Sequence, residues 1–519
     1  MAAVEAEAVE TRVPAHRDRG RPRLPTWFLV VIAAILIAGR LTYSFVVPPN
    51  MDEAYYFFWG QHLQLSYFDH APLQGWMQGL SAAIFGFTTL GLRAMNQLTL
   101  LGSALIFWAW ATRLAPEDRV NAFWTIFTVY LASPIVFGIS LLSYPDHWLM
   151  FLSLASMHFF ALFLAERLED RPGDYRHLYA GAALLGVAAL AKYNAVTLGL
   201  ALAAAIVFHP RLRPLLRNVH LYLAALVSVA MLTPVLVWNS MNEFASLRFQ
   251  LVDRFGPGGP GGAQLWGEFS AERFLAFAVL LVVYVSVALA LPAIWLYWRP
   301  AGGGFRGALV LLGKWGLATA VLPIVAVSFF TKGAPHWTMV GLVAFVPLAA
   351  FYFRWRWLLA VHLALGTVLM TLVSVYFATY PTFSSAVLGD REAASYYGYD
   401  QVASRMLELR DEYGAAGLAS LRYGSASKLA FGAGPGVFVT SLAPAHEAFD
   451  DWRDEEALQG KDLIIHDEWN AIGHIERQFD TVTLLDEITP TRFGRPLIRY
   501  RIYLGKGYKG LAETDGSGE

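Results

Sequence analysis

Long apolar runs separated by short polar turns make up most of the chain before residue 380. A helix that spans a bilayer needs about 20 mostly apolar residues, and most of these runs approach or exceed that length. The runs are 27–47, 89–112, 119–142, 147–165, 177–191, 194–208, 219–238, 273–297, 307–330, 337–353 and 357–379. The pattern therefore predicts a polytopic α-helical membrane protein with about 11 spans, two of which, flanking Lys192, are short.

The remaining segment, residues 381–519, has a different pattern. Charged residues become common, and short β-rich runs occur at 437–440, 463–465 and 499–503. Between them, 401–413 and 444–458 have helical patterns. Strand-like runs that alternate with helical segments indicate a small soluble α/β domain. The chain thus divides into a tail, 1–25, a membrane domain, 26–380, and this α/β domain.

Composition and charge narrow the class of protein. Hydrophobic residues make up 56% of the chain and charged residues 15%, with a mean hydropathy of +0.44. Soluble proteins carry about 25% charged residues, so the composition agrees with a membrane protein. The net charge is −1 and no basic run is interleaved with aromatic residues, so nothing indicates a nucleic-acid partner. The chain has no cysteine, which excludes disulfides and thiolate metal sites.

The distribution of Lys and Arg predicts an orientation. One set of turns is rich in them: Arg12, Arg17, Arg19, Arg21, Arg23, Arg113, Arg119, Arg167, Arg171, Arg176, Arg211, Arg213, Arg217, Arg299, Arg306, Lys314, Arg354 and Arg356. The alternate turns hold few, and the first of them, 48–88, holds none. Because Lys and Arg accumulate on the cytoplasmic side, we expect a cytoplasmic N-terminus in a bacterial inner membrane. The first loop and the α/β domain are then periplasmic.

Polar residues gather at the predicted outer ends of the spans. They are Arg40, Asp52, Glu53, Asp69, His70, Arg93, Asp146, Lys192, Tyr193, Asn239, Lys332 and His336. Ionisable residues near a membrane are costly and mark functional sites. Carboxylates can take a proton from an attacking hydroxyl, and cations can stabilise a phosphate leaving group. The set therefore indicates a transferase that acts on an anionic lipid.

The acidic candidates also have structural alternatives. Asp52 could be the N-cap of a helix, and Glu53 could interact with a helix dipole from the first turn. Asp69 could form a turn before Pro72. Asp146 follows a proline and could cap the fourth span.

The other candidates have structural alternatives of their own. Lys192, Arg40 and Arg93 could extend their side chains to the interface. Asn239 could cap the end of the seventh span, and His70 could form hydrogen bonds at the interface. The functional reading of His336, by contrast, is a metal ligand or a phosphate donor.

The aromatic run Tyr55-Tyr56-Phe57-Phe58-Trp59 can be interpreted in two ways. It could form an interfacial aromatic belt or a platform for a sugar ring. Aromatic residues gather at both surfaces of membranes, so the pattern favours the belt.

The order and spacing of these motifs resemble the GT-C membrane glycosyltransferases. The resemblance is closest to their bacterial protein mannosyltransferase-like branch, which includes lipid A aminoarabinose and galacturonosyl transferases. It covers roughly residues 27–380. The motifs are Asp52-Glu53, Tyr67-Phe68-Asp69-His70-Ala71-Pro72-Leu73, Pro145-Asp146, Lys192-Tyr193, Trp238-Asn239 with Ser246 and Gln250, and His336-Trp337.

The resemblance implies a fold of many helices with amphipathic helices in the first outer loop. It implies inverting transfer of a monosaccharide from a polyprenyl-phosphate carrier to an envelope lipid, glycan or protein. Asp52 matches the family's catalytic carboxylate, Asp69 an acidic position for donor or metal, and Lys192 a phosphate-contacting lysine. His70 stands where some relatives have Lys, and Ala71-Pro72 where many have Pro-Pro.

We predict catalytic roles for Asp52, Asp69 and Asp146. The predicted substrate-binding residues are Glu53, Tyr56, His70, Arg93, Lys192, Tyr193, Asn239, Lys332 and His336. No cofactor is assigned. A divalent metal stays open, with Asp52, Asp69 and His336 as candidate ligands, because no spacing of His, Asp and Glu here is diagnostic.

Two other classes of function compete with a transferase. A transporter or flippase of lipid-linked sugars would place polar residues near the middle of the bilayer, and many transporters consist of two repeated halves. Here the polar residues are at the ends of spans and no repeat is evident. An inactive scaffold that only binds the acceptor would not need both Asp52 and Asp69.

Overall fold

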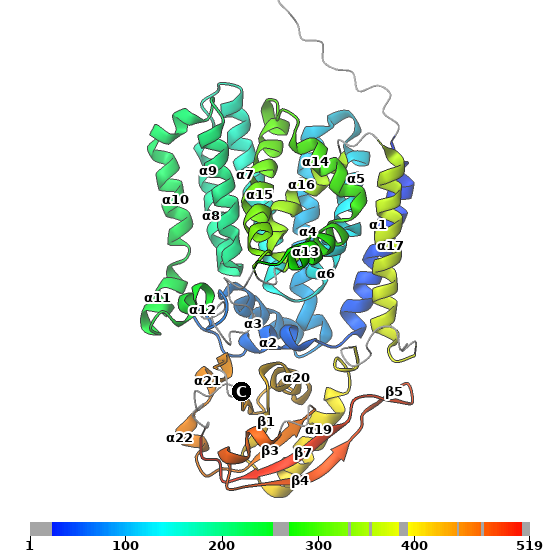
Figure 1. Ribbon diagram of the computed structural model, residues 1–519, viewed down its shortest axis with the longest axis vertical. Coiled ribbons are helices and arrows are strands. Elements are labelled where there is room, and N and C mark those ends of the chain that lie inside the picture. The colour runs from blue at the N-terminus through cyan, green and yellow to red at the C-terminus, as the bar shows by residue number, and fades with distance from the viewer. Residues whose placement is uncertain are drawn as a thin grey trace, which may run out of the picture.

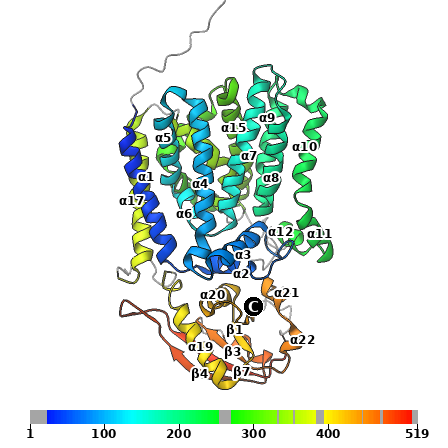
Figure 2. The same ribbon diagram turned by 180° about the vertical axis from the view of Figure 1, so that it is seen from behind.

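The computed structural model describes residues 23–252, 269–330, 334–351, 355–382, 393–443, 446–468 and 472–510. A layer of long helices stands above a smaller α/β layer (Figure 1). The first helix begins at the end of the helical layer that lies away from the α/β layer, and Figure 2 shows the same arrangement from behind. The predicted Lys332 falls outside the described residues.

Five helices are long and apolar enough to cross a membrane, within the ranges given above. They are α1 (Thr26–Val46), α4 (Thr89–Leu114), α7 (Pro145–Leu168), α15 (Gly304–Val327) and α17 (Arg356–Thr379). The shorter helices of this layer are α8 (Tyr175–Ala191), α9 (Val196–Phe208), α12 (Ala245–Leu251) and α16 (Met339–Phe351). Short 3₁₀ turns join several of them: η1 (Pro116–Asp118), η2 (Tyr193–Ala195), η3 (Arg213–Arg217) and η5 (Pro335–Thr338).

Three further pairs of helices are bent at a short break. The pairs are α5 (Arg119–Ala132) with α6 (Pro134–Leu141), α10 (Val219–Ala230) with α11 (Thr233–Met241), and α13 (Ala271–Val285) with α14 (Val287–Tyr297). The first bend is 74°, and a proline begins α6 because its fixed φ suits the first turn of a helix but not its interior. Among the described residues, eight crossings result if each pair counts as one. The predicted number of spans stays a prediction.

Two short helices of the first loop lie across the end of the helical layer. They are α2 (Met51–Trp59) and α3 (Leu73–Phe85), and both views place them between the long helices and the α/β layer. Helix α2 begins with a capping box, in which Asn50 Oδ1 accepts a hydrogen bond from the Glu53 backbone and Glu53 Oε2 accepts one from the Asn50 backbone. The helices that the resemblance implied for this loop are therefore present.

The α/β layer is built on a five-stranded sheet of order β2-β1-β3-β7-β4. Strands β1, β2 and β3 are parallel, and β7 pairs antiparallel with both β3 and β4. The main elements are α19 (Tyr399–Tyr413), β1 (Gly417–Ser420), α20 (Tyr423–Ala433), β2 (Val439–Ser441), α21 (Ala448–Trp452), α22 (Glu455–Leu458), β3 (Leu463–Asp467), β4 (Thr481–Ile488) and β7 (Tyr500–Lys506). The small elements are η6 (Ile472–His474), η7 (Glu476–Gln478), β5 (Thr491–Arg492) and β6 (Arg495–Pro496), the last two forming a separate ribbon.

Several predicted elements of this layer are confirmed. Strands β3 and β7 include the predicted 463–465 and most of 499–503, and α19 covers the predicted helix 401–413. The prediction of one helix over 444–458 is wrong, because Arg453 adopts an extended conformation and Asp454 caps a second short helix. Helix α20 was not predicted.

One apolar cluster joins the two layers. Tyr55, Trp59 and Tyr67 of the first loop share it with core residues of the α/β layer such as Val402 and Leu429. A shared core fixes how the two layers meet. The site described next lies along this junction.

Candidate active site

Asp52 lies in the first turn of α2, and a tyrosine of the α/β layer contacts it. The Tyr423 hydroxyl donates a hydrogen bond to Asp52 Oδ1 at 3.0 Å. Burial raises the pKa of Asp52, and the hydrogen bonds from Tyr423 and Tyr144 act in the opposite direction. Because Asn50 is the N-cap of α2, the alternative reading of Asp52 as an N-cap is wrong.

The contact is made by the carboxyl edge of the parallel strands. Tyr423 begins α20 directly after β1, and Glu447 follows β2. Glu447 Oε1 accepts a hydrogen bond from the Tyr423 backbone at 3.3 Å, and the backbone of Ala448 donates one to the Tyr55 hydroxyl at 3.2 Å. Ligands of open α/β sheets bind at this edge. Here the edge faces α2.

Glu447 is an acidic group at this edge with a pKa near neutrality. Burial raises its pKa to about 7, and the charges of Asp450 and Asp69 add to the rise. Asp69 also acts on the phenols of Tyr55 and Tyr193. Asp69 is half-buried, its charge acts on groups of both the first loop and the α/β layer, and its backbone carbonyl accepts a hydrogen bond from Gln250.

Three predicted acids converge on one phenol, that of Tyr56. Burial raises the pKa of Tyr56, and the charges of Asp52, Asp69 and Asp146 add to the rise. The Tyr56 ring also lies 5.7 Å from the ring of His70. The charges of the three residues predicted to be catalytic, far apart in sequence, therefore all act on one side chain.

Asp146 and Lys192 form a buried ion pair. Lys192 Nζ lies 2.9 Å from each oxygen of Asp146, and the two side chains are 13% and 4% exposed. Tyr144 is the N-cap of α7 and no side chain caps that helix, so the capping alternative for Asp146 is wrong. The charges of His336 and His70 also act on Asp146. This carboxylate therefore holds Lys192 in place.

Glu53 and Arg93, both predicted to bind substrate, are turned inward instead. Arg93 Nη2 and Nε lie 2.6 and 2.7 Å from the two oxygens of Glu53, and both side chains are buried. Arg93 Nη1 also donates to the Val47 carbonyl at 2.6 Å, and Glu53 Oε1 accepts from the Ser143 backbone at 2.8 Å. Their polar atoms contact protein, so the geometry gives the pair a positioning role between α2 and α4.

Arg40 and Asn239 are likewise engaged inside the protein. Arg40 is buried and donates to Gln97 Oε1 at 3.0 Å and to Ser140 Oγ at 2.7 Å, so its alternative reading as an interfacial arginine is wrong. Asn239 is fully buried, donates to the Val235 carbonyl and accepts from the Leu247 backbone. It thus joins α11 to α12.

The aromatic run of α2 faces protein and not lipid. Tyr55, Phe57 and Trp59 are buried. The ring of Phe57 lies 5.3 Å from Phe431, and the ring of Tyr55 lies 4.7 Å from Tyr423. The favoured interpretation of this run as an interfacial belt is therefore wrong.

A large groove opens beside the acids. Its volume is about 830 Å³, and α8, α9, α10 and α15 supply most of its walls. The lining is apolar along these helices, for example Leu185, Leu200 and Val229. The polar end carries His70, Lys192, Tyr193, Asn194 and Gln250. The groove can therefore take a long apolar chain with an anionic group at one end.

Within the described ranges, no group of three or more His, Asp or Glu side chains is arranged to hold a metal ion. Asp52, Asp69 and His336 are therefore not assigned as metal ligands.

Sequence reasoning missed Tyr423, Tyr144 and Glu447. Tyr423 is 371 residues from Asp52, in a Gly- and Ser-rich stretch that gave no helical signal. Tyr144 directly precedes the motif Pro145-Asp146, and this position next to a candidate acid is the signal that could have identified it.

Comparisons with known proteins find membrane glycosyltransferases. The family model described as dolichyl-phosphate-mannose-protein mannosyltransferase matches residues 69–238. The chain is 23% identical over 370 residues to the lipid A galacturonosyltransferase RgtD of Rhizobium johnstonii, which covers 70% of this chain and 73% of RgtD.

Solved structures share the fold. Crystal structures of ArnT from Cupriavidus metallidurans, bound to undecaprenyl phosphate and in the apo state, each have a TM-score of 0.62 and 13% identity. They cover 92% and 95% of this chain and 98% and 99% of ArnT. The chain therefore has the fold of the GT-C membrane glycosyltransferases, and it is similar to RgtD in sequence and to ArnT in structure.

Proposed function

We propose that the protein is an inverting glycosyltransferase that moves a monosaccharide from a polyprenyl phosphate to an envelope acceptor, with lipid A as the first acceptor to test. The observation that carries the proposal is the apolar groove that ends at Lys192 and His70, beside the acids around Tyr56. RgtD, a lipid A galacturonosyltransferase, and ArnT, solved with bound undecaprenyl phosphate, suggest the classes of acceptor and carrier.

The groove is the proposed site of the donor. Its apolar walls suit a polyprenyl chain, and Lys192 at its polar end suits the phosphate as a charge-assisted donor. Asp146 keeps the Lys192 ammonium aimed at this end. A fixed cation at the place where charge develops in the transition state accelerates loss of the leaving group.

Asp52 is the proposed general base. It takes the proton of the acceptor hydroxyl, whose oxygen then forms a bond to the anomeric carbon of the sugar. The bond between that carbon and the phosphate oxygen breaks, and its electron pair leaves with the polyprenyl phosphate. A single displacement inverts the anomeric carbon.

We also propose that the α/β layer faces the periplasm. The support comes from the positively charged turns, because Arg113 and Arg119 flank α4 and α5 at the end of the helical layer away from the α/β layer. Arg23 pairs with Asp118 at the same end. Cytoplasmic turns are the ones that accumulate such residues.

The direct test uses purified protein in lipid nanodiscs with undecaprenyl-phosphate-linked sugars and lipid A. We expect mass spectrometry to detect glycosylated lipid A and free undecaprenyl phosphate in equal amounts, with galacturonic acid as the first sugar. A flippase would move the donor between leaflets without breaking the sugar–phosphate bond. Intact donor after incubation with every sugar and acceptor of the panel contradicts the proposal.

Variants of the ion pair separate the roles of its two members. We expect Asp146→Asn to raise the donor KM by less than tenfold, because the Lys192 cation remains. The double variant Asp146→Asn/Lys192→Met removes the cation without leaving a buried charge unpaired. We expect it to raise the donor KM by about 10- to 100-fold, since a hydrogen bond to a charged group contributes about 1.5–3 kcal/mol. Equal losses in the two variants would assign catalysis to Asp146 itself.

Tyr423 is expected to act through Asp52, as a positioning residue. A base works in its charged form, and the Tyr423 hydroxyl stabilises that form. Tyr423→Phe removes this hydrogen bond, so the pKa of Asp52 rises. We expect the acidic limb of the kcat profile to move up by about 1 pH unit, while the rates of the variant and the parent converge at alkaline pH.

Tyr413, an exposed tyrosine at the end of α19, provides the control. Tyr413→Phe should leave the pH profile where it is. If Tyr423→Phe lowers kcat by one factor at all pH values, the hydroxyl has a structural role and does not tune Asp52.

A further inference from the structure

We propose that a second pocket, at the junction of the two layers, binds the phosphorylated saccharide headgroup of the glycolipid acceptor. This inference rests on the proposed function and gives its acceptor a place. The pocket has a volume of about 450 Å³, within the range of about 300–1,000 Å³ that is usual for small-ligand sites.

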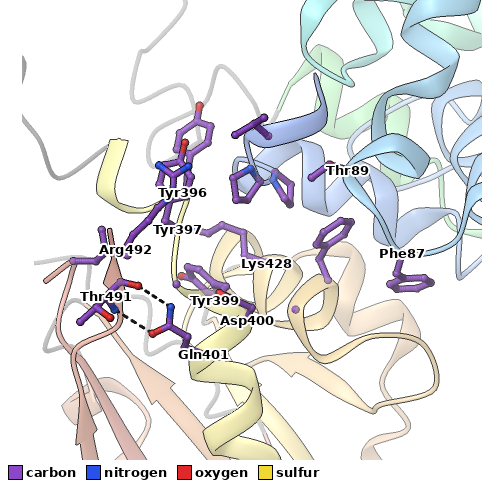
Figure 3. Close-up of a pocket in the computed structure, with 17 residues that line it drawn as sticks. Phe87, Thr89, Tyr396, Tyr397, Tyr399, Asp400, Gln401, Lys428, Thr491 and Arg492 are labelled. Atoms are coloured by element: carbon purple, nitrogen blue, oxygen red, sulfur yellow. Dashed lines mark hydrogen bonds between the residues drawn. The ribbon is translucent and has the colours of Figure 1, made fainter. Parts of the chain in front are cut away.

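The walls come from both layers. The ends of α1 and α4 supply Val46 and Thr89, and the α/β layer supplies the segment 396–399, which holds three tyrosines and one glycine, together with α20 (Figure 3). Tyr396, Tyr397 and Tyr399 offer aromatic faces and hydroxyls, the mixture that fits a sugar ring. A hydrogen-bonded pair, Gln401 with Thr491, also lines the pocket, with bonds of 3.0 and 3.1 Å.

Lys428 gives the pocket its preference for an anion. Its side chain is 5% exposed and lies at the centre of the residues drawn in Figure 3. Lys428 Nζ donates to the Ser395 carbonyl at 2.9 Å and lies 4.3 Å from the centre of the Tyr399 ring. An ammonium group has three protons to donate, and charge in a buried place is costly unless it is paired.

The other charges around the pocket are of both signs. Burial lowers the pKa of Lys428, and the charge of Glu468 opposes this effect. Arg492 is a second cation, which donates to the Ala378 carbonyl at 2.8 Å and lies 4.1 Å from the centre of the Tyr397 ring. Asp400 is exposed at the outer edge. Of the charged residues that line the pocket, two are cations, Lys428 and Arg492, and one is an acid, Asp400.

A short chain of contacts links the pocket to Asp52. Tyr396, in the pocket wall, forms a hydrogen bond to the Asn50 side chain. The Tyr144 hydroxyl donates to the same Asn50 at 3.3 Å and also bonds Asp52. Asn50 caps the helix whose first turn carries Asp52. Hydrogen bonds through Asn50 therefore connect the wall of the pocket to the proposed base.

The pocket and the donor groove have separate walls. The groove is lined mostly by α8, α9, α10 and α15, whereas the pocket is lined by the ends of α1 and α4 and by the α/β layer, and the two share no lining residue. An inverting displacement needs separate places for the acceptor and the donor phosphate, because the nucleophile and the leaving group occupy opposite faces of the sugar.

The membrane side of the pocket suits an amphipathic ligand. Phe45, Val46 and Leu90, at the ends of α1 and α4, are exposed apolar residues. Acyl chains along this surface would leave the polar headgroup at the level of Lys428. An apolar surface next to a pocket that contains a buried cation favours a glycolipid over a free sugar phosphate.

The test measures KM for both substrates in nanodiscs, with lipid A as the acceptor probe. Lys428→Gln removes the buried cation. Thr89→Trp fills the pocket from a half-buried position on α4, and the Thr89 hydroxyl bonds Phe45 and not Lys428. We expect each variant to raise the acceptor KM by about tenfold, with the donor KM changed less than twofold. Lys461→Gln, at an exposed lysine of the same layer, is the matched control and should resemble the parent.

Each other outcome overturns the inference. An acceptor KM within twofold of the parent for folded Thr89→Trp places the acceptor elsewhere, even if Lys428→Gln fails to fold. Competition by phosphatidylglycerol with a potency equal to that of lipid A makes the pocket a general anionic-lipid site. If the parent protein transfers no sugar at all, the proposed function fails first, so the two failures are distinguishable.

Discussion

Asp52→Asn is expected to lower kcat by about 10²- to 10⁴-fold, the range that general base catalysis contributes. Asparagine keeps the shape of the side chain and can still accept the hydrogen bond of Tyr423, so the fold of α2 should not change. It cannot take a proton from the acceptor hydroxyl. The measurement is single-turnover transfer from a labelled polyprenyl-phosphate sugar, with the donor KM recorded alongside.

A matched control guards this result against a general loss of fold. Asp170→Asn makes the same chemical change at an exposed residue after α7, which pairs loosely with Arg211 at 3.9 Å. It should keep the parent rate. Asp52→Asn with more than about a tenth of the parent kcat would remove Asp52 as the base and direct attention to Asp69 or Glu447.

The helical layer was largely predictable because each long span is determined by the apolar composition of its own continuous segment of sequence. Twenty apolar residues such as 27–47 have one structural solution in lipid, a helix, so α1 follows from its own composition. The bends were not predictable in the same way. A run such as 119–142 reads as one apolar segment, yet Ser133-Pro134 divides it into helices that meet at 74°.

Only part of the site was predictable. The residues at the ends of the spans have a pattern in the sequence that identifies them, and the residues of α20 do not. Asp52, Asp146 and Lys192 stand out as charges at the ends of apolar runs, and the structure brings them around Tyr56 and the groove. The same signal also selected Glu53, which pairs internally. Polarity at a span end identifies a residue with a partner, and it does not say whether the partner is substrate or protein.

The half contributed by α20 carries no such signal. A β-carbon on Gly424 would lie 2.6 Å from the β-carbon of Met51, so the small residue is required by the close approach of α20 to α2. In the sequence alone, a glycine at this position is typical of a loop. Tyr423, which depends on the same approach to contact Asp52, is therefore visible only after the two layers are placed together.

Breaking the Glu53–Arg93 pair is expected to have the largest effect on stability. Both side chains are buried and share two short contacts, so removal of one partner leaves a charge without its counter-ion inside the protein. We expect Glu53→Met or Arg93→Met to lower the free energy of unfolding by about 3–5 kcal/mol. Unfolding in mixed detergent micelles with increasing dodecyl sulfate, followed by tryptophan fluorescence, measures the change.

The double variant Glu53→Met/Arg93→Met decides why the single variants are unstable. Replacing a whole buried pair with apolar side chains is often neutral, so we expect the double variant to be more stable than either single one. A double variant that loses the sum of the two single losses would show no coupling between the residues. Because the pair joins α2 to α4 next to Asp52, we expect the double variant to regain stability relative to the single variants but not their lost turnover. If it regains both, apolar packing alone sets the position of the base.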